Sequence, residues 1–493
     1  MSEKSKTFGE LKQSLWGTPS MQKRTVKDEM RANLIGKLQN GDLLFPGIVG
    51  YDDSVIPQII NAVLSRHNMI LLGLRGQAKS RILRSLIELL DPEIPVLTGC
   101  EINDSPFSPV CRYCRSLLRQ KGEATPISFF PRSERFVEKL ATPDVTIADM
   151  LGDLDPIRAA RGGLNLSDEL TIHFGLLPRA NRGIFAINEL PDLAGKIQVG
   201  LFNILQEGDI QIKGFPIRLA LDVAMVFTAN PEDYTARGKI ITPLKDRIGS
   251  EIRTHYPVTL DHGIAITEQE AWIQRHQSTP LLVPLYIKEV VEGVAFQARQ
   301  DKKVDKRSGV SQRLPITVLE NVISNAERRA ITHREKKVVP RIADIYAAIP
   351  SMTGKLELEY EGELKGAESV ALELIRSSVR QCFQQIFEGV DQQQIVDWFE
   401  LGGSLKLSDM APSAEVFKQL SLIQGLTEKL AVLGVSKKDD VALQVSAGEF
   451  ILEGLYAMQK INRSEEKGFV ATERKRVETY LDEKPGRSRK SFN

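Results

Sequence analysis

The sequence predicts an α/β fold with a parallel sheet, followed by a long helical region. Apolar runs typical of buried parallel strands occupy 69–72, 184–187 and 222–228, and amphipathic helix patterns follow the first two runs. From residue 265 onward the periodicity is helical. The chain has 493 residues, of which 42% are hydrophobic and 26% charged. These values are ordinary for a globular protein of two to four domains.

The composition excludes several classes of protein. A net charge of +1 gives no overall field that would attract a nucleic acid or a membrane surface. No apolar run approaches the roughly 18 residues of a membrane-spanning helix. Residues 1–15 lack the apolar centre of a secretory signal, and four cysteines do not make a disulfide framework in this chain. We therefore expect a cytoplasmic protein.

A glycine-containing loop follows the first apolar run. The stretch Gly73-Leu74-Arg75-Gly76-Gln77-Ala78-Lys79-Ser80 approaches the phosphate-binding pattern G-x-x-x-x-G-K-[ST], with a strand before it and an amphipathic helix after it. The loop amides and the helix N-terminus would cradle phosphates, Lys79 would reach the β and γ oxygens, and Ser80 would hold Mg²⁺. The predicted nucleotide contacts are Gly73, Arg75, Gly76, Gln77, Ala78, Lys79, Ser80 and Arg81.

Two features of this loop leave room for another interpretation. Ala78 stands where the pattern has its second glycine. Because alanine disfavours the left-handed region, we expect a negative φ at Ala78 if the loop follows the usual path. The alternative to nucleotide binding is an ordinary strand-to-helix turn that carries an exposed lysine.

The segment before the loop is a candidate adenine contact. Residues 1–44 are polar and are expected to form a loose arm with one helix near Val26–Leu38. The stretch Phe45-Pro46-Gly47-Ile48-Val49-Gly50 then precedes a helix pattern. Ile48 and Val49 are predicted to pack on an adenine ring, although a plain turn would have much the same sequence.

A group of cysteines lies between the predicted strand at 94–97 and the second apolar run. Residues 98–176 are expected to be insertions that include a hairpin. Within them, Cys100, Cys111 and Cys114 have the spacing of an incomplete zinc site, because a structural site needs four ligands. His173 or Asp104 would have to supply the fourth ligand. The alternative is a set of ordinary reduced cysteines.

Polar residues end the two later strands. Asn188 and Glu189 follow the run 184–187, where Glu189 would polarise an attacking water and Asn188 would bind Mg²⁺ through water. Asparagine in place of aspartate removes a charge and should weaken metal binding. Asn230 ends the run 222–228 and is predicted to hold the same water and to sense the γ-phosphate. The alternative is a core strand that ends in polar residues.

Two arginines further along are candidate phosphate contacts. Arg247 follows Asp246, and it either pairs with that carboxylate on a surface or reaches the γ-phosphate bound by a neighbouring subunit. Arg313 lies at the start of a predicted helix, which is unfavourable for a cation unless it faces a phosphate. Residues after 350 look helical and contain no catalytic pattern.

In this order, the segments resemble one protein family. From about residue 45 to residue 330 the chain is similar to the AAA+ ATPases of the MoxR and magnesium-chelatase motor-subunit (ChlI-like) group. The matching segments are Phe45-Pro46, Ile48-Val49-Gly50, Gly73 to Ser80, Gly175-Leu176-Leu177, Ala180-Asn181-Arg182-Gly183-Ile184, Asn188-Glu189, Asn230-Pro231-Glu232, Leu244, Asp246-Arg247 and Arg313. The run from Gly175 to Glu189 is the most specific of them.

This resemblance implies a domain organisation and residue roles. It implies an αβα P-loop core over 45–260 and an α-helical lid over 261–350. The residue pattern itself predicts a helical C-terminal domain over 351–480 and a basic, disordered tail over 481–493. The implied roles are Walker A for Lys79 and Ser80, Walker B for Asn188 and Glu189, sensor 1 for Asn230, the trans-acting arginine finger for Arg247 and sensor 2 for Arg313.

The resemblance also implies a function. Members of this group form rings, commonly hexamers, and often act with a partner that has a von Willebrand A (VWA) domain. The sequence contains no DxSxS motif, so such a partner would be a separate polypeptide. We expect ATP hydrolysis with Mg²⁺, coupled to remodelling of a client protein. Two alternatives are the motor subunit of a magnesium chelatase and a nucleotide-gated scaffold with weak hydrolysis. An enhancer-dependent transcription activator is disfavoured because no GAFTGA loop is present.

Overall fold

The computed structural model of the chain describes residues 4–163, 165, 168–212, 218–231, 239–275, 279–464 and 466–472. The chain divides into two compact units. Unit 1 comprises Met1–Ala271, Ala298–Ile316 and Gly354–Leu364, and unit 2 comprises Trp272–Gln297, Thr317–Thr353 and Lys365–Asn493. Glu232 and the predicted tail at 481–493 lie outside the described residues.

A five-stranded parallel sheet lies at the centre of unit 1, which confirms the predicted α/β class. All four neighbouring pairs of strands are parallel. The three apolar runs of the sequence form the three central strands. In spatial order the strands are β11 (Ser250–Arg253), β1 (Met69–Leu72), β10 (Val223–Ala229), β7 (Gly183–Asn188) and β4 (Phe136–Leu140).

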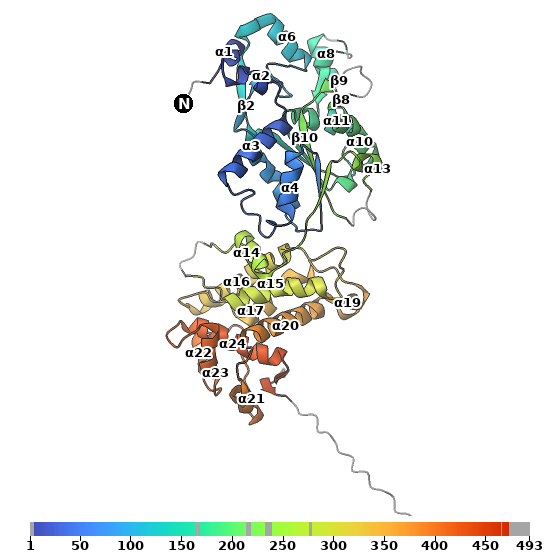
Figure 1. Cartoon of the computed structure of the whole chain (residues 1–493). Coiled ribbons are helices and arrows are strands. Elements are labelled where there is room, and N and C mark those ends of the chain that lie inside the picture. Colours follow the sequence, from blue (N-terminus) through green and yellow to red (C-terminus); the bar gives the residue numbers. More distant parts are fainter. Residues whose placement is uncertain are drawn as a thin grey trace, which may run out of the picture. The chain divides into compact units, whose positions relative to one another are not determined.

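Alternate residues of the central strands face two hydrophobic cores, as expected for a sheet covered on both sides. In β7, Ile184 and Ala186 belong to one core, while Phe185 and Ile187 belong to the other. Figure 1 shows the sheet between α3 and α4 on one side and α10 and α11 on the other. The first core includes α3 (Val26–Asn40), α4 (Val55–Leu64) and α5 (Lys79–Ser85), and the second includes α7 (Ile147–Leu151), α9 (Leu176–Arg179), α10 (Gly195–Gly200) and α11 (Phe202–Gln206).

Helix α3 confirms the helix predicted near 26–38, and its ends have clear causes. Thr25 and Asp28 form a capping box at its start, and Gly41 ends it with a φ of 71°. The other helices of unit 1 are α1 (Phe8–Gln13), α2 (Pro19–Gln22), α6 (Arg112–Lys121), α8 (Pro156–Gly162), α13 (Thr242–Lys245) and α14 (Leu260–Glu270), and α19 (Tyr360–Lys365) lies at its last segment.

Three antiparallel pairs of strands accompany the main sheet. The predicted strand at 94–97 is β2 (Glu93–Leu97), which pairs with β3 (Ile127–Pro131). Strand β5 (Gly152–Leu154) pairs with β6 (Ile172–Phe174) in the region where a hairpin was expected. Strands β8 (Asp209–Gln211) and β9 (Arg218–Ala220) form a further antiparallel pair, and the residues at 213–217 that connect them lie outside the described residues.

The sequence patterns miss the two edge strands of the main sheet. Strand β4 lies inside the range 98–176 that was assigned to insertions, and β11 lies where no strand was predicted. Edge strands have a partner on one side only, so they need no continuous apolar run. In β4 the residues Glu138 and Lys139 interrupt the pattern, and in β11 only Ile252 is fully buried.

Unit 2 is mainly helical, and one of its longer helices is α24 (Val441–Ala457). Its Phe450 stacks on Tyr286 with the ring centroids 4.8 Å apart, and Phe383 lies 6.0 Å from the same ring. The expectation of helices alone after residue 350 is wrong, because β12 (Ile461–Ser464) and β13 (Gly468–Ala471) form a hairpin. The remaining helices include α15 (Leu285–Gln300) and α16 (Arg313–His333), which extend into unit 1, and α17 (Ile342–Ala347), α18 (Pro350–Thr353), α20 (Ala367–Ile386), α21 (Gln393–Glu400), α22 (Ser413–Leu420) and α23 (Leu426–Lys429).

Within the described ranges, no helix is long and apolar enough to cross a bilayer.

Candidate nucleotide-binding site

The carboxyl ends of β1, β10 and β7 meet at one edge of the sheet, because the three strands are parallel neighbours. Leu72 and Ala229 end β1 and β10 in register, and the Gly73 amide donates to the Ala229 carbonyl at 3.1 Å. The loop that starts at Gly73 therefore lies beside the strand ends that carry Asn188, Glu189 and Asn230. Parallel-sheet proteins bind ligands at this edge.

Two positions of the loop require glycine. A Cβ added to Gly73 would lie 1.9 Å from Thr254 Oγ1. A Cβ added to Gly76 would lie 2.1 Å from Ser311 Oγ, and Gly76 has a φ of +73°. The loop is thus packed tightly between Thr254, which follows β11, and the segment around Ser311 that leads into α16.

Ala78 adopts a left-handed conformation, with a φ of 56° and a ψ of 13°. The expectation of a negative φ is therefore wrong. The turn from the loop into α5 needs a left-handed residue at this point, and alanine occupies it at a cost of roughly 1 kcal/mol relative to glycine. Ala78 thus adopts a backbone conformation that glycine favours.

Lys79 is buried, with 8% of its surface exposed. Its ammonium donates to the carbonyl of Gly73 and, at 3.0 Å, to the carbonyl of Leu74. The alternative of an ordinary turn predicted an exposed lysine, so that part of the alternative is wrong. The cation lies over the loop instead of extending into solvent, as a lysine that binds phosphate there must.

Other side chains of the loop hold it in place. Gln77 is buried, and its Oε1 accepts a 2.8 Å hydrogen bond from the Thr254 hydroxyl. The Tyr51 hydroxyl donates to the Gln77 carbonyl at 3.1 Å and to the His255 carbonyl at 2.6 Å. Burial raises the pKa of Tyr51 to about 12, so the phenol stays protonated and keeps donating at neutral pH.

The two arginines predicted to contact nucleotide lie in exposed ion pairs. Arg75 pairs with Glu357, and Arg81 pairs with Glu270 of α14. The side chain of Ser80, the predicted Mg²⁺ ligand, is half-buried at the start of α5. The backbone of Arg75 also accepts a 2.9 Å hydrogen bond from Tyr256.

The predicted adenine contacts, Ile48 and Val49, lie in a half-buried turn between α3 and α4. The preceding carbonyl, that of Gly47, accepts a 3.0 Å hydrogen bond from Gln269 of α14. A Cβ added to Gly47 would come within 2.8 Å of the Arg81 guanidinium. The turn therefore lies next to the helix that begins with Lys79, as an adenine contact requires.

Asn188 belongs to a polar group that the sequence did not predict. Its amide donates to Glu138 of β4, and its Oδ1 accepts a 3.2 Å hydrogen bond from the Thr228 hydroxyl of β10. Glu138 also holds Arg84 of α5 through a bond of 2.8 Å. A carboxylate on the neighbouring strand thus lies beside the position where asparagine replaces the usual aspartate. Recognising β4 as a strand would have revealed Glu138.

The Thr228 hydroxyl connects Asn188 to Glu189. It accepts a 3.0 Å hydrogen bond from the Glu189 amide, whose residue has a φ of 54°. Glu189 is half-buried, and Asn230 is buried with 6% of its surface exposed. The left-handed conformation of Glu189 turns the chain away directly after β7 ends. The Glu189 side chain therefore lies at the edge of the sheet.

The pairing of Asn188 with Glu138 predicts a strong coupling between the two positions. Asn188→Asp places two carboxylates in contact, so we expect a loss of stability, and adding Glu138→Gln should restore a carboxylate–amide pair. In a double-mutant cycle of urea unfolding, the coupling should be about 1–3 kcal/mol at pH 8. It should shrink at pH 5, because one shared proton relieves the repulsion. Additive effects at pH 8 would contradict the pairing.

Arg247 does not pair with Asp246. Its guanidinium donates to Gln206 Oε1 at 2.9 and 3.1 Å and to the Pro243 carbonyl at 2.7 Å. It also lies over the Phe202 ring, 5.0 Å from the centroid. Both Gln206 and Phe202 belong to α11, so the half-buried cation is held at a defined place on the surface of unit 1.

Arg313 is exposed at the start of α16. Its backbone amide donates to Ser311 Oγ at 3.2 Å. The same oxygen is the atom that would clash with a Cβ added to Gly76. The start of α16 therefore lies beside the loop, which is where a residue that contacts a bound phosphate would be.

The three cysteines lie close together in the structure, and the fourth residue of the group is Asp104 and not His173. One ligand atom from each of Cys100, Asp104, Cys111 and Cys114 lies within 4.8 Å of the others. His173 is exposed in β6. Burial raises the pKa of Asp104 to about 6.

Comparisons with known proteins place the chain near one group. No protein-family model matches it. It is 29% identical to the magnesium-chelatase subunit ChlI homolog of Methanocaldococcus jannaschii over 214 residues, which cover 42% of this chain and 53% of that protein. It is 27% identical to the magnesium-chelatase 38 kDa subunit of Cereibacter sphaeroides over 239 residues, covering 48% and 65%. The chain is therefore similar, at low identity and over about half of its length, to magnesium-chelatase ChlI subunits.

Two solved structures also match the chain. The complex of subunits BchI and BchD of magnesium chelatase gives a TM-score of 0.33 at 22% identity, with 65% of this chain and 98% of that chain covered. A putative ATPase from Cytophaga hutchinsonii gives 0.30 at 14% identity, with 71% and 96% covered.

The predicted resemblance to the AAA+ ATPases of the magnesium-chelatase group is confirmed at low identity. The chain has the expected α/β P-loop core with a helical C-terminal region. It spans about half the length of the Methanocaldococcus protein that it matches.

Proposed function

We propose that this protein binds ATP and Mg²⁺ at the edge of the sheet and couples ATP hydrolysis to remodelling or activation of a client protein. The observation that supports this most is that four polar residues end or follow three neighbouring parallel strands at the same edge of the sheet. Buried Lys79 lies after the loop that follows β1, Asn188 ends β7 with Glu189 directly after it, and Asn230 follows β10. A lysine that binds phosphates, next to an acid that positions water, is the arrangement of P-loop ATPases.

The residues present fit a nucleoside triphosphate with Mg²⁺. The ammonium of Lys79 already lies over the loop, and Ala78 adopts the left-handed conformation that glycine favours. Lys79 would contact the β and γ oxygens, and Ser80 with Asn188 would hold Mg²⁺. The bound ion supplies neutralisation of phosphate charge. Ile48 and Val49 would contact the base.

Glu189 and Asn230 have the chemistry to act on a water molecule. Glu189 orients the water and accepts its proton, while the Asn230 amide holds the same water from the adjacent strand. Thr228 links these strands by binding both Asn188 and the Glu189 amide, so it fixes the spacing of the two groups. Thr228 is a positioning residue in this proposal.

The proposal includes a ring, commonly a hexamer, in which Arg247 reaches the γ-phosphate bound by the adjacent copy. Arg247 is anchored by Gln206 and Phe202 at the surface of unit 1, and no carboxylate is among its hydrogen-bond acceptors. Arg313 would contact the phosphates within the same protomer. A separate polypeptide with a VWA domain is the proposed partner, in keeping with the MoxR and magnesium-chelatase groups, and the lid at 261–350 would transmit closure.

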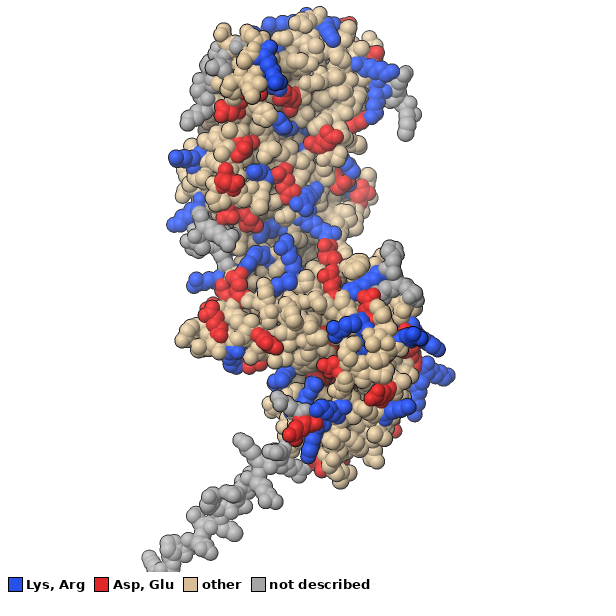
Figure 2. Space-filling view, turned by 180° about the vertical axis from the view of Figure 1, so that it is seen from behind, with Lys and Arg blue, Asp and Glu red and all other residues tan. Residues whose placement is uncertain are grey.

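Two other functions are weaker candidates. The motor subunit of a magnesium chelatase is favoured by the names of the relatives. A nucleotide-gated scaffold is favoured by Ala78 and Asn188, which depart from the hydrolytic pattern. A nucleic-acid motor has less support, because basic and acidic side chains are interspersed on the face shown in Figure 2.

Measuring ATP turnover beside assembly tests the proposal and separates it from the scaffold. We expect Mg²⁺-dependent ATPase activity from the purified full chain, in rings that form when ATP is added. The measurements are phosphate release and light scattering with and without nucleotide. Assembly without any turnover would favour the scaffold and contradict the proposed motor.

A further inference from the structure

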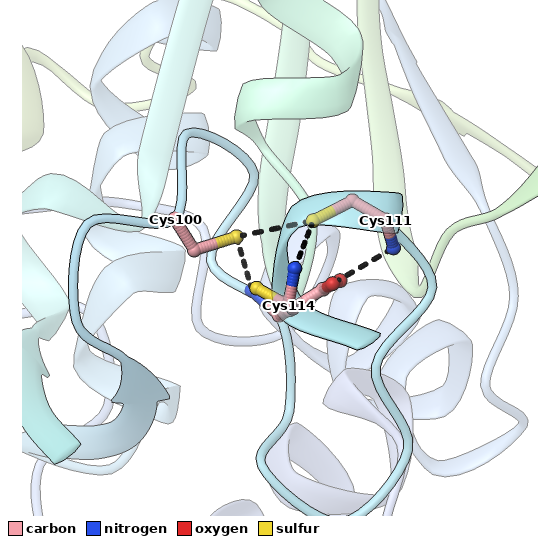
Figure 3. A group of neighbouring side chains, drawn as sticks. Cys100, Cys111 and Cys114 are labelled. Carbon is pink, nitrogen blue, oxygen red and sulfur yellow. Dashed lines mark hydrogen bonds between the residues drawn. The ribbon is translucent and has the colours of Figure 1, made fainter. Parts of the chain in front are cut away.

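The segment between β2 and α6 brings three thiols and one carboxylate to a single point. Figure 3 shows the sulfur atoms of Cys100, Cys111 and Cys114 turned toward one another. The sulfurs of Cys100 and Cys111 are 4.0 Å apart, and the four candidate ligand atoms lie within 4.8 Å of one another. All of the cysteines are free thiols.

These distances match those of a tetrahedral metal site. Zinc binds thiolate sulfur at about 2.3 Å, so sulfurs on neighbouring corners of the tetrahedron lie about 3.8 Å apart. Carboxylate oxygen is an accepted ligand of zinc, and a set of four protein ligands is typical of structural sites.

Asp104 distinguishes this group from thiols that merely pack in a core. It is fully buried, with 0% of its surface exposed. Its Oδ2 accepts hydrogen bonds from the amides of Val110 and Cys111 at 3.0 and 2.9 Å. Its Oδ1 has no hydrogen-bond partner among the described residues. Leaving a buried carboxylate oxygen without a partner is unfavourable, and a bound cation removes this penalty.

Backbone amides hold two of the sulfur atoms in place. The Asp104 amide donates to Cys100 Sγ at 3.4 Å, and the Cys114 amide donates to Cys111 Sγ at 3.4 Å. These hydrogen bonds orient the ligands before metal arrives.

We propose that Cys100, Asp104, Cys111 and Cys114 bind one structural Zn²⁺ ion. Four protein ligands leave no open position for a substrate, so the ion is structural and not catalytic. A cavity of about 240 Å³ lined by Cys111, with Tyr113 and Glu169, gives the ion a path of entry.

The zinc ties the inserted segment to the start of β7. Asn181 donates to the Ile102 carbonyl at 3.0 Å, and Asn103 donates to the Arg179 carbonyl at 2.9 Å. Both contacts lie between ligands Cys100 and Asp104 and the residues that precede β7. Holding Cys100 and Asp104 to α6 through the metal therefore stabilises this junction.

Metal analysis of the full chain, purified without an affinity tag or chelator and under reducing conditions, tests the site. We expect about one zinc per chain. Cys111→Ser and Cys114→Ser should each lower the zinc affinity at least tenfold. Cys382→Ser is the matched control, because Cys382 is also buried but lies in unit 2 and donates to Glu289. Asp104→Cys should retain zinc, whereas Asp104→Ala should lose it.

Two measurements on the unaltered protein keep the proposal testable if the variants fold poorly. Exchange of zinc for Co²⁺ should give the visible absorption of a tetrahedral thiolate site. Chelator should lower the unfolding temperature, and added Zn²⁺ should restore it. Wild-type protein that holds no zinc and gives no Co²⁺ spectrum after reduction would overturn the proposal. A Cys100–Cys111 disulfide that persists in protein purified under reducing conditions would also overturn the proposal.

Discussion

Lys79→Ala is expected to remove ATP binding and to lower turnover about 100-fold or more. The ammonium is buried over the loop, where water cannot replace it, and it donates to the carbonyls of Gly73 and Leu74. Its removal takes away the positive charge that the proposed site offers to the β and γ oxygens. Binding is measured with a fluorescent ATP analogue, and turnover is measured by phosphate release.

Folding must be separated from binding in this experiment, because the alanine also leaves two loop carbonyls with one donor fewer. Circular dichroism should show that the variant is folded. Addition of ATP and Mg²⁺ should raise the unfolding temperature of the wild-type protein but not that of the variant. Lys336→Ala changes an exposed lysine of unit 2 and should leave binding unchanged. A folded Lys79→Ala protein with wild-type affinity for ATP would contradict the proposed site.

Arg247→Ala is expected to lower turnover by about 10³-fold or more while ATP binding stays near the wild-type level. The reason is that Arg247 would complete the site of the adjacent protomer and not its own. Activity should return when Arg247→Ala is mixed with Lys79→Ala. In mixed rings, a Lys79→Ala protomer supplies its intact Arg247 to a neighbour that still binds ATP.

Gln206→Ala is the control for the local structure around this arginine. It removes the acceptor that holds the guanidinium at 2.9 Å but keeps the charge, so it should lower turnover far less than Arg247→Ala. If mixing the two inactive variants restores no activity although mixed rings form, Arg247 does not act across the boundary. Rings are detected by light scattering before turnover is measured.

The sequence predicted the centre of the fold better than its edges. Strands β1, β7 and β10 are buried on both faces, so their residues are almost all apolar and the runs are visible. Strand β4 contains Glu138 and Lys139 and has a partner on one side only, so its sequence looks like a loop. The hairpin β12–β13 is short and mixed in polarity, and it escaped notice for the same reason.

The sequence predicted which residues follow the strands at this sheet edge, but not the contacts that they make. The positions of Lys79, Glu189 and Asn230 follow from strands that end at one sheet edge. The left-handed φ of Ala78 was not predictable, because intrinsic preference points to a negative φ and the packing of the loop overrides it. The contact of Glu138 with Asn188 depends on strand pairing, which residue spacing does not encode.

Because β4 is an edge strand of the sheet, Glu138 has a second role besides its contact with Asn188. Among the described strands, β4 pairs with β7 alone, so its other side presents unpaired backbone groups. Exposed edges of this kind invite β-strand addition by another chain and therefore aggregation, and charged residues on them are a common protection. Neutral replacements of Glu138 or Lys139 should therefore lower the concentration at which the protein stays monodisperse, even where catalysis is unaffected.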